Sequence, residues 1–415
     1  MSNDVVLLKN LCVDNEWGKY GIPASAEDYH VEKTRYLRIT DISDDGVLLD
    51  NDKKSVTSDD IEKYLLKEGD IVFARTGNST GRTYYHEAKN GELAYAGFLI
   101  KYTLDKKKVN PKYLKFYTLS KEYKSWVKNL SVGSTRGNIN AQTFANCPIS
   151  LPNENQQDLL VDTLSLLIDK IELNNRINCV LESMAKTLYD YWFVQFDFPN
   201  SEGDPYKTSG GKMVWNEELK REIPKGWNVK ILADITDVSN ESVYPMAFPD
   251  KEFKHYSIPT FDESGTYGIE KGVDIKSNKF IVSKSDVLVS KLNPWFNRVV
   301  YSTEENDLIC STEFVVWRTN SIEMKNYMYM IARDASFITS CTNSATGTSN
   351  SHKRVNPSVM MKYKIAFNED VAELFGKKLG STIKMYANNQ VENKTLSDLR
   401  DWLLPMLMNG QVKVK

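Results

Sequence analysis

The sequence has little with which to build a metal centre, a disulfide framework or a membrane segment. Its five cysteines lie far apart and form no CxxC pair, and its four histidines are equally scattered. This argues against a disulfide scaffold and against a zinc site made of these residues. We find no long apolar run and no signal-peptide pattern at residues 1–9, so we expect a cytoplasmic protein without membrane contact.

An excess of charge of one sign is also missing. The formal net charge is -2 over 415 residues, so a global basic character does not indicate nucleic-acid binding, and any such surface must be local. A hydrophobic content of 41% and a charged content of 26% are typical of a soluble globular protein. The length suggests two to three domains.

Patterns typical of catalysis are absent too. We find no nucleophile next to a base, no motif of paired carboxylates and no metal cluster in the sequence. The sequence therefore predicts a binding protein that carries no cofactor and no metal of its own.

What the chain does contain is an internal repeat. LKEGDIVFART at residues 66–76 places Gly-Asp before an apolar strand with a basic end, and VSKSDVLVSKLNP at 282–294 repeats this shape. Asp70 corresponds to Asp286, and Arg75 to Lys291. Further on, each half has a loop rich in hydroxyl groups, SVGSTRGN at 131–138 and TGTSNSHKR at 346–354, followed by a turn and an apolar segment. The halves therefore predict two similar domains.

Each half also ends in a long apolar seam. From residue 160 to 192 and again from 375 to 403, apolar positions alternate in steps of four and three, which is typical of a coiled coil. Asparagines interrupt both seams, a feature that fixes register at a cost in stability. They are Asn174, Asn178, Asn389 and Asn393. Antiparallel pairing would place Asn174 opposite Asn393 and Asn178 opposite Asn389.

An alternative is that each helix packs only on its own domain. Thr382 and Arg400, which fall within the second seam, favour this alternative. The matched asparagine pairs favour pairing of the two helices.

We therefore predict an α+β fold. Two mixed α/β globular domains are joined and separated by two long antiparallel coiled-coil helices, with pseudo-two-fold symmetry. The linker between the halves is rich in Gly, Pro and Ser. The predicted divisions are a first domain at 1–152, a spacer helix at 153–196, a linker at 197–215, a second domain at 216–367 and a second spacer helix at 368–410.

The stretch FARTGNSTGRT at residues 73–83 resembles a phosphate-binding nucleotide loop. A P-loop has four residues between its glycines and a lysine after the second, whereas here three residues separate Gly77 from Gly81 and Arg82 follows. We therefore disfavour nucleotide hydrolysis. The same hydroxyl, amide and guanidinium groups suit contacts with DNA phosphates and base edges. A solvated turn is the alternative.

NPWF at residues 293–296 resembles the Asn-Pro-Pro-aromatic turn of DNA adenine methyltransferases, which grips a flipped base. Trp295 replaces the second proline, and no glycine-rich cofactor loop of that family is present. Autonomous methyl transfer by residues 293–296 is therefore a minor alternative. Trp295 either packs internally or faces DNA.

The candidate DNA-binding residues come from four loops, two in each half. Glycine permits close approach of the backbone, and the basic residues supply local charge. In the first half they are Arg75, Thr76, Asn78, Ser79, Thr80, Arg82, Ser134, Thr135, Arg136 and Asn138. In the second half they are Lys291, Asn293, Asn297, Arg298, Thr348, Ser349, Asn350, His352, Lys353 and Arg354.

Three segments carry a resemblance to a known family. They are DKIELNNRINCVLESMAKTLYDYWFVQFDFP at 169–199, IPKGWNVKILADI at 223–235 and LRDWLLPMLMNGQV at 399–412. The chain resembles, over essentially its whole length, the DNA-specificity subunits of Type I restriction–modification systems. The resemblance implies two target-recognition domains that alternate with two helical repeats, the same plan as the internal repeat predicts.

The resemblance also implies partners and chemistry outside this chain. Each recognition domain would read one half of a bipartite asymmetric site in double-stranded DNA. The helices would fix the gap and dock two methyltransferase subunits, which use S-adenosylmethionine to methylate adenine N6. Restriction subunits, dependent on ATP and Mg²⁺, would add cleavage. Two alternatives stay open: a specificity subunit of a fused restriction-methyltransferase system, and a coiled-coil scaffold that binds no nucleic acid.

Overall fold

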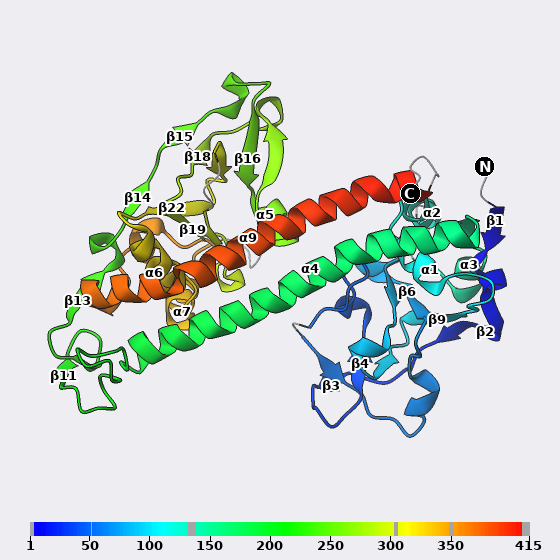
Figure 1. Ribbon diagram of the computed structural model, residues 1–415, viewed down its shortest axis with the longest axis horizontal. Coiled ribbons are helices and arrows are strands. Elements are labelled where there is room, and N and C mark those ends of the chain that lie inside the picture. Colours follow the sequence, from blue (N-terminus) through cyan, green and yellow to red (C-terminus); the bar gives the residue numbers. More distant parts are fainter. Residues whose placement is uncertain (1–3, 51, 132–137, 303–305, 348–351, 409–415) are drawn as a thin grey trace. The chain divides into compact units, whose positions relative to one another are not determined.

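The computed structural model describes residues 4–50, 52–131, 138–302, 306–347 and 352–408 (Figure 1). The chain divides into two compact units. The first unit combines Met1–Asp169 with Ser397–Lys415, and the second is Lys170–Leu396. The two long helices α4, Glu154–Tyr189, and α9, Glu369–Met408, each contribute to both units.

The globular part of the first unit is built on a four-stranded antiparallel sheet of order β2-β9-β6-β7. A smaller sheet of order β3-β5-β4-β8 contains one parallel pair, β4 with β8, and β1 pairs with β10. The strands are β1 Asp4–Leu7, β2 Cys12–Tyr20, β3 Glu27–Asp28, β4 Arg35–Leu37, β5 Lys54–Ser55, β6 Asp70–Ala74, β7 Thr83–Tyr85, β8 Leu93–Tyr95, β9 Leu99–Leu104 and β10 Pro148–Leu151. The short helices are α1 Pro111–Tyr117, α2 Lys121–Ser131 and α3 Ala141–Ala145.

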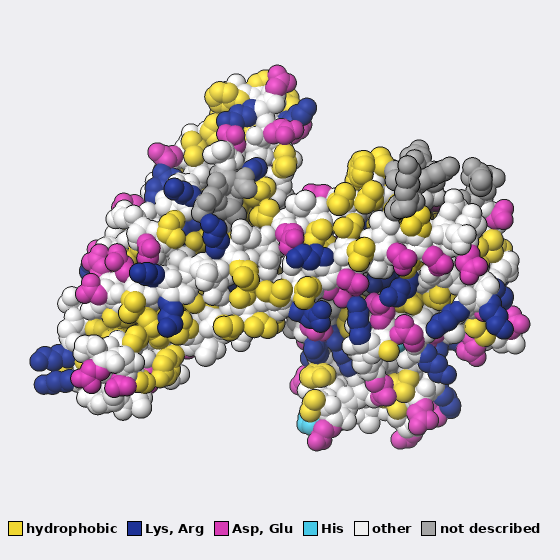
Figure 2. All heavy atoms as spheres, viewed as in Figure 1, with side chains coloured by type: hydrophobic (Ala, Val, Ile, Leu, Met, Phe, Trp, Pro, Cys, Tyr) yellow, Lys and Arg dark blue, Asp and Glu magenta, His cyan; other side chains and the backbone are white. Residues whose placement is uncertain are grey.

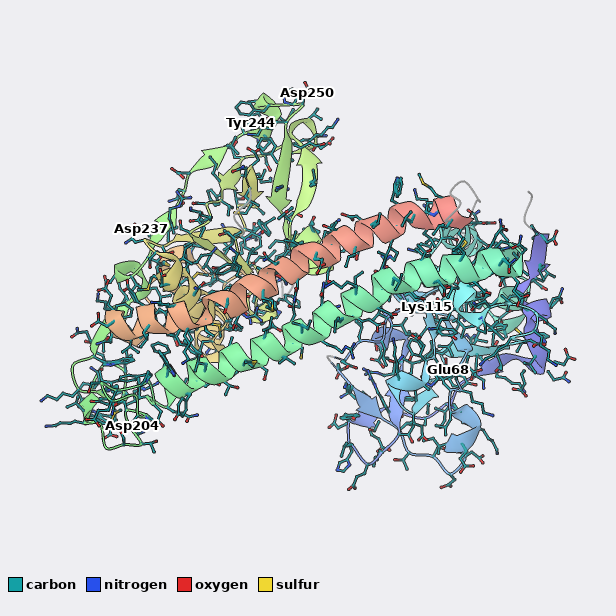
Figure 3. The ribbon with its side chains drawn as sticks, in the orientation of Figure 1. Glu68, Lys115, Asp204, Asp237, Tyr244 and Asp250 are labelled. Carbon is teal, nitrogen blue, oxygen red and sulfur yellow. The ribbon has the colours of Figure 1, made fainter. Side chains whose placement is uncertain are left out.

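The second unit repeats the order of the main sheet and the pairing of β1 with β10, whereas its smaller sheet has one more strand and a different order. Its main sheet has the order β14-β22-β19-β20, its smaller sheet is β15-β18-β21-β16-β17 with β16 parallel to β21, and β13 pairs with β23. The strands are β11 Met213–Asn216, β12 Arg221–Pro224, β13 Asn228–Ile231, β14 Asp237–Ser239, β15 Ser242–Val243, β16 Glu252–Tyr256, β17 Gly268–Lys271, β18 Lys279–Ile281, β19 Asp286–Ser290, β20 Val299–Tyr301, β21 Leu308–Cys310, β22 Phe314–Arg318 and β23 Lys364–Phe367. The helices are α5 Ile258–Ser264, α6 Ile322–Ala332, α7 Ala335–Ser344 and α8 Pro357–Met360. Tyr244 and Asp250 lie on the connection from β15 to β16, at the end of this unit remote from α9 (Figure 3).

The central strand of each main sheet begins at a buried aspartate. A shift of 216 positions carries Asp70 of β6 onto Asp286 of β19, and both are almost fully buried. The Asp70 carboxylate accepts the backbone N–H of Lys67 at 2.9 Å, and that of Asp286 accepts the N–H of Ser283 at 2.7 Å. Because each carboxylate fastens the turn that enters its strand, the Asp of the repeated Gly-Asp/Ser-Asp pattern has a structural role in the fold.

The apolar seams of the long helices complete the two main cores. In the first unit, Leu160 and Leu164 of α4 and Leu404 of α9 pack into the cluster that contains Ile71 and Phe73 of β6. In the second unit, Ala185, Phe375 and Leu379 belong to the cluster beneath α6 and β19. The helices therefore share the largest buried cluster of each unit with its globular part, and smaller clusters lie apart from it.

The two helices pair antiparallel in the second unit through the predicted asparagines. Asn174 Nδ2 donates a hydrogen bond to Asn393 Oδ1 at 2.9 Å, and Asn389 Nδ2 donates one to Asn178 Oδ1 at 2.8 Å. These are the partners that antiparallel register predicts. Asn174 also donates to Glu392 Oε2 at 2.7 Å, beside the Lys170–Glu392 ion pair. The predicted α+β class with two domains and long antiparallel helices is confirmed.

Arg400, which interrupts the predicted seam, is nevertheless buried in the first unit. Its Nη1 lies 3.0 Å from Asp45 Oδ2, and its Nε lies 2.8 Å from Asp401 Oδ1. Although Arg400 interrupts the apolar seam, α9 therefore still packs on the globular part of the first unit at this position. A charged side chain at this point ties the helix to the loop that carries Asp45.

Candidate nucleic-acid interface

One loop of the same geometry follows the central strand in each unit. After β6 the chain makes a 3₁₀ turn at Gly77–Ser79 before β7, and after β19 it makes one at Pro294–Phe296 before β20. Each loop has two residues in the left-handed region at equivalent positions: Gly77 and Gly81 in the first loop, Asn293 and Asn297 in the second. We call residues 75–82 the first recognition loop and residues 291–298 the second recognition loop.

The glycines of the first recognition loop therefore meet a backbone requirement. Their φ angles are +73° and +87°, and asparagine, the residue that best tolerates this region after glycine, fills both positions in the second loop. A Cβ on Gly81 would lie 2.5 Å from Cγ1 of Val127. These observations account for the glycine spacing without a bound nucleotide, in agreement with our rejection of the P-loop interpretation.

The second basic segment of each half joins the recognition loop of its own unit. Ile139 N donates to Arg75 O at 2.9 Å, and the equivalent Val355 N donates to Lys291 O at 3.0 Å. Arg75 Nε also donates to Asn138 Oδ1 at 3.2 Å, and the Arg75 guanidinium lies 5.0 Å from the centre of the Tyr20 ring. Candidate residues far apart in sequence thus form one site in each unit.

Two arginines of these loops are held by carboxylates. Arg82 Nε lies 2.6 Å from Asp44 Oδ1, and Arg298 makes two contacts with the Asp262 carboxylate, at 2.5 and 2.7 Å. Arg354 is paired in the same way with Glu313. These pairings offset part of the positive charge of the three guanidinium groups.

The remaining candidates are divided between exposed and buried positions. Asn78, His352 and Arg354 are exposed, and Thr76, Thr80, Lys291 and Lys353 are half-buried. Ser79 and Asn293 are buried. The candidates Ser134, Thr135, Arg136, Thr348, Ser349 and Asn350 lie outside the described residues.

Asn293 is not placed as a base-gripping asparagine would be. It is 7% exposed, its backbone N–H donates to Lys353 O at 2.7 Å, and its Oδ1 accepts the Lys353 N–H at 3.0 Å. The side-chain oxygen that would hold a target amine is thus occupied by the protein backbone. Trp295 and Phe296, in contrast, are 39% and 57% exposed, so neither belongs to the core. The resemblance of residues 293–296 to a methyltransferase turn therefore does not extend to its geometry.

A groove lies beside the first recognition loop. It has a volume of about 820 Å³ and is lined on one side by Thr76, Asn78, Thr80 and Arg82 of the loop. The opposite side is lined by Lys124 and Lys128 of α2. These lysines were missed from the sequence, although their four-residue spacing in a helical segment places them on one face.

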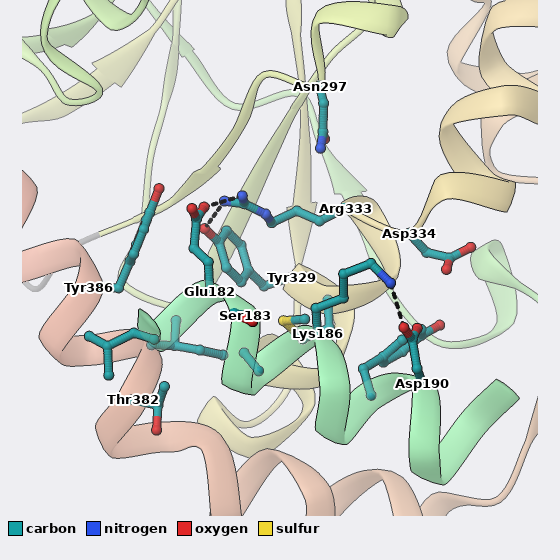
Figure 4. Close-up of a pocket in the computed structure, with 15 residues that line it drawn as sticks. Glu182, Ser183, Lys186, Asp190, Asn297, Tyr329, Arg333, Asp334, Thr382 and Tyr386 are labelled. Carbon is teal, nitrogen blue, oxygen red and sulfur yellow. Dashed lines mark hydrogen bonds and ion pairs between the residues drawn. The ribbon is translucent and has the colours of Figure 1, made fainter. Parts of the chain in front are cut away.

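A pocket of about 460 Å³ in the second unit is lined by residues of α4, α6 and α9 (Figure 4). Arg333, just after α6, donates to Glu182 of α4 and to the Tyr329 hydroxyl, the latter at 2.7 Å. Its guanidinium also lies 5.7 Å from the centre of the Tyr386 ring of α9. Asn297 of the second recognition loop borders this pocket, and its buried Oδ1 has no hydrogen-bond partner among the described residues. Arg333 therefore connects the globular part of this unit to both helices.

Nucleophilic chemistry has little support in the described residues. Burial raises the pKa of the Cys147 and Cys341 thiols to about 12, so both are protonated at neutral pH. No group of three His, Cys, Asp or Glu side chains among residues 4–50, 52–131, 138–302, 306–347 and 352–408 could hold a metal ion. No described helix is both long and apolar enough to cross a membrane.

Comparisons with known proteins show which sequences the chain resembles. Residues 13–183 match the model of the Type I restriction modification DNA specificity domain. The chain is 26% identical over 345 residues to the Type I restriction enzyme MjaIX specificity subunit of Methanocaldococcus jannaschii, an alignment that covers 80% of this chain and 76% of that protein. It is 22% identical over 425 residues to the HindI specificity subunit of Haemophilus influenzae, covering 84% and 88%.

The fold has a solved counterpart. The crystal structure of a Type I restriction-modification system S subunit from M. genitalium aligns with 97% of this chain and 95% of its own, with a TM-score of 0.59 and 14% identity. That likeness concerns the fold, whereas the two sequence relatives and the domain model concern the family. In sequence and in fold, the chain is therefore similar to the specificity subunits of Type I restriction–modification systems.

Proposed function

We propose that this chain reads a bipartite asymmetric site in double-stranded DNA, with one recognition loop and its neighbouring basic segment for each half-site. The observation that carries the proposal is the matched pair of loops, in which the same backbone frame recurs at Asp70–Tyr85 and Asp286–Tyr301. Different side chains on one frame suit two different half-site sequences. Phosphate contacts would fix register, and contacts to base edges would select sequence.

The catalytic work would belong to partner subunits. Two DNA methyltransferase subunits that bind S-adenosylmethionine would methylate adenine N6, one in each half-site. Restriction subunits, with ATP and Mg²⁺, would convert the complex into a nuclease in the cytoplasm. If the partner is instead a fused restriction-methyltransferase, this chain has the same recognition role. Identifying the subunits that co-purify with the chain distinguishes separate partner subunits from a fused one.

An exposed apolar stripe on α4 suits the docking of methyltransferase subunits. In the second unit, Leu173, Val180 and Met184 lie on one face of the helix, and the last two are 58% and 59% exposed. Figure 2 shows hydrophobic side chains along this helix. Since isolated apolar side chains are common on surfaces but aligned ones mark contact sites, the stripe is the best candidate for a protein interface.

Pull-down of the methyltransferase subunit tests this docking face. Val180→Asp with Met184→Asp should abolish co-purification, because the charges would have to be desolvated in the interface. Cys179→Asp provides the control, since Cys179 is exposed on another face of the same helix. Equal retention of the partner by both variants would reject the stripe as the docking face.

Selection from a random duplex pool tests the recognition role. With the chain and its methyltransferase partner, the selected DNA should contain two defined blocks separated by unspecified bases. Arg75→Ala combined with Asn138→Ala should relax one block, and Lys291→Ala combined with Lys353→Ala should relax the other. Relaxation of both blocks by either variant, or of neither by both, would contradict a division of labour between the loops.

We further propose that the helix pair sets the distance between the half-sites. Seven residues inserted after Asp169 and seven after Leu396 would add roughly 10 Å to both helices and preserve the seam. Because one base pair occupies about 3.4 Å, the unspecified spacer should lengthen by up to about three base pairs. A folded double-insertion variant whose DNA site has an unchanged spacer would contradict the proposal that the helix pair sets this distance.

A further inference from the structure

The two recognition loops share a backbone but have opposite surface chemistry. A shift of 216 positions carries Ser79 and Thr80 onto Trp295 and Phe296. The tip of the first loop is therefore polar, whereas the tip of the second presents two aromatic rings whose centres are 5.9 Å apart. This difference comes from side chains alone, because the left-handed positions on either side are the same.

The helices beside the loops differ in the same direction. Lys124 and Lys128 of α2 line the groove of the first unit, and no ion pair joins either of them to another described residue. Asp44 and Arg82 in that groove are paired with each other at 2.6 Å. The pairing leaves the two lysines as the net charge of the groove lining, at a spacing suited to a phosphate backbone.

The equivalent helix of the second unit is uncharged. The same shift carries Lys124 and Lys128 onto Ser340 and Ser344 of α7, and the α7 sequence ASFITSCTNS contains no charged residue. Phe337 and Ile338 of α7, with Pro294 of the loop, border a cavity of only about 10 Å³. The cavity between helix and loop is thus nearly filled in the second unit, whereas in the first a groove of about 820 Å³ lies beside the point where Tyr123 of α2 donates a hydrogen bond to Gly81 of the loop.

The aromatic tip of the second loop is held ready for contact. The Arg298 guanidinium lies 4.5 Å from the centre of the Phe296 ring, and Asp262 fixes that guanidinium through two contacts. A cation over the ring face restrains the ring, although the residue is 57% exposed. Exposed aromatic rings on a fixed loop are suited to stacking on bases or to packing against thymine methyl groups.

We propose that the two recognition units bind DNA by different physical means, a refinement that rests on the proposed function. In the first unit, Lys124 and Lys128 hold the phosphate backbone in the groove beside the polar loop. In the second unit, Trp295 and Phe296 make the decisive contacts, which are apolar. Half-site binding is therefore strongly salt-dependent in the first unit and weakly so in the second.

The test measures affinity against salt for the full chain with its methyltransferase subunits, on duplex DNA that carries the selected site. Lys124→Gln with Lys128→Gln should lower the slope of log K against log[salt] by about 1.8, since each phosphate contact contributes about 0.9. Trp295→Ala with Phe296→Ala should weaken binding at least tenfold at every salt concentration and change the slope by less than about 0.5. Thermal unfolding of each variant verifies that these surface changes leave the fold intact.

Two matched variants serve as controls. Lys121→Gln removes an exposed lysine of α2 outside the groove lining, and Phe248→Ala removes an exposed phenylalanine of the second unit outside the loop. Both should retain wild-type affinity and slope. An unchanged slope in the lysine variant, or unchanged affinity in the aromatic variant, would overturn the inference. Failure of the wild-type complex to prefer its site would instead overturn the proposed function.

Discussion

Asn389 Nδ2 lies 2.8 Å from Asn178 Oδ1, so the polar layer between α4 and α9 is a direct side-chain hydrogen bond. Asn174 and Asn393 form the next layer, at 2.9 Å. Any slip of one helix along the other would separate both pairs and leave the buried amides of Asn174 and Asn178 without these partners. The two layers therefore specify one register, which a uniformly apolar seam would not do.

Replacing one member of a layer should cost more than replacing both. Asn178→Leu leaves the Asn389 amide without this partner and should lower the free energy of unfolding by about 1–3 kcal/mol. Asn178→Leu with Asn389→Leu should recover most of that loss. Urea denaturation of the two single variants and the double variant gives the coupling, with Asn388→Leu, at an exposed neighbouring position, as the control. Additive losses would show that the layer is not a coupled pair.

The Arg298–Asp262 pair should act on DNA binding as a unit. If Arg298 works by holding the second recognition loop, then Arg298→Ala and Asp262→Ala should weaken binding to a similar extent. The variant with both changes should be no weaker than either alone. DNA affinity of the assembled complex is the measurement. If Asp262→Ala left affinity unchanged while Arg298→Ala reduced it, Arg298 would instead contact DNA directly.

The two glycines of the first recognition loop should differ in their tolerance of a side chain. Gly77→Ala meets no atom within 4 Å and should cost roughly 1–2 kcal/mol for its left-handed backbone. Gly81→Ala also forces a Cβ against Val127, which adds about 1–3 kcal/mol of overpacking. Chemical denaturation of both variants checks the order. A Gly77→Ala variant that is less stable than Gly81→Ala would contradict the described loop geometry.

Glu87 should make the first unit sensitive to acid. Burial alone would raise its pKa, but Lys115 and Lys112 outweigh that effect and lower it from 4.5 to about 2. A carboxylate with a depressed pKa in the folded state stabilises above its unfolded pKa and loses that contribution as pH falls. The stability difference between wild type and Glu87→Gln should therefore be full above about pH 5 and should vanish towards pH 2. Thermal unfolding across this range measures it, and a difference that does not depend on pH would contradict the assignment.

The long helices could be predicted because a seam of apolar residues in three- and four-residue steps is a local sequence pattern. Asparagines at matched positions of the two seams then identify each helix as the partner of the other. The sequence also identified Arg75 and Lys291 as equivalent, which the backbone bonds from Ile139 and Val355 support. The pairing of loop arginines with carboxylates could not be predicted in this way. Arg82 and Arg298 meet Asp44 and Asp262, whose proximity depends on folding of distant segments.

Two further features escaped prediction for physical reasons. Arg400 breaks the apolar pattern of its helix, and only the folded chain brings Asp45 within 3.0 Å to pair with it. Lys124 and Lys128 belong to a short helix with an ordinary charge pattern, and only the position of the first recognition loop makes them one wall of a groove. Both cases need long-range contacts that no local pattern contains.

The most direct test of the central claim is to map methylated adenines in DNA from cells that express this chain together with its methyltransferase subunit, and from cells that lack either chain. The account predicts a motif of two defined blocks with unspecified bases between them, one methyladenine in each block, and no such methylation when either chain is omitted. Methylation of a single uninterrupted motif, or the same methylation without this chain, would contradict it.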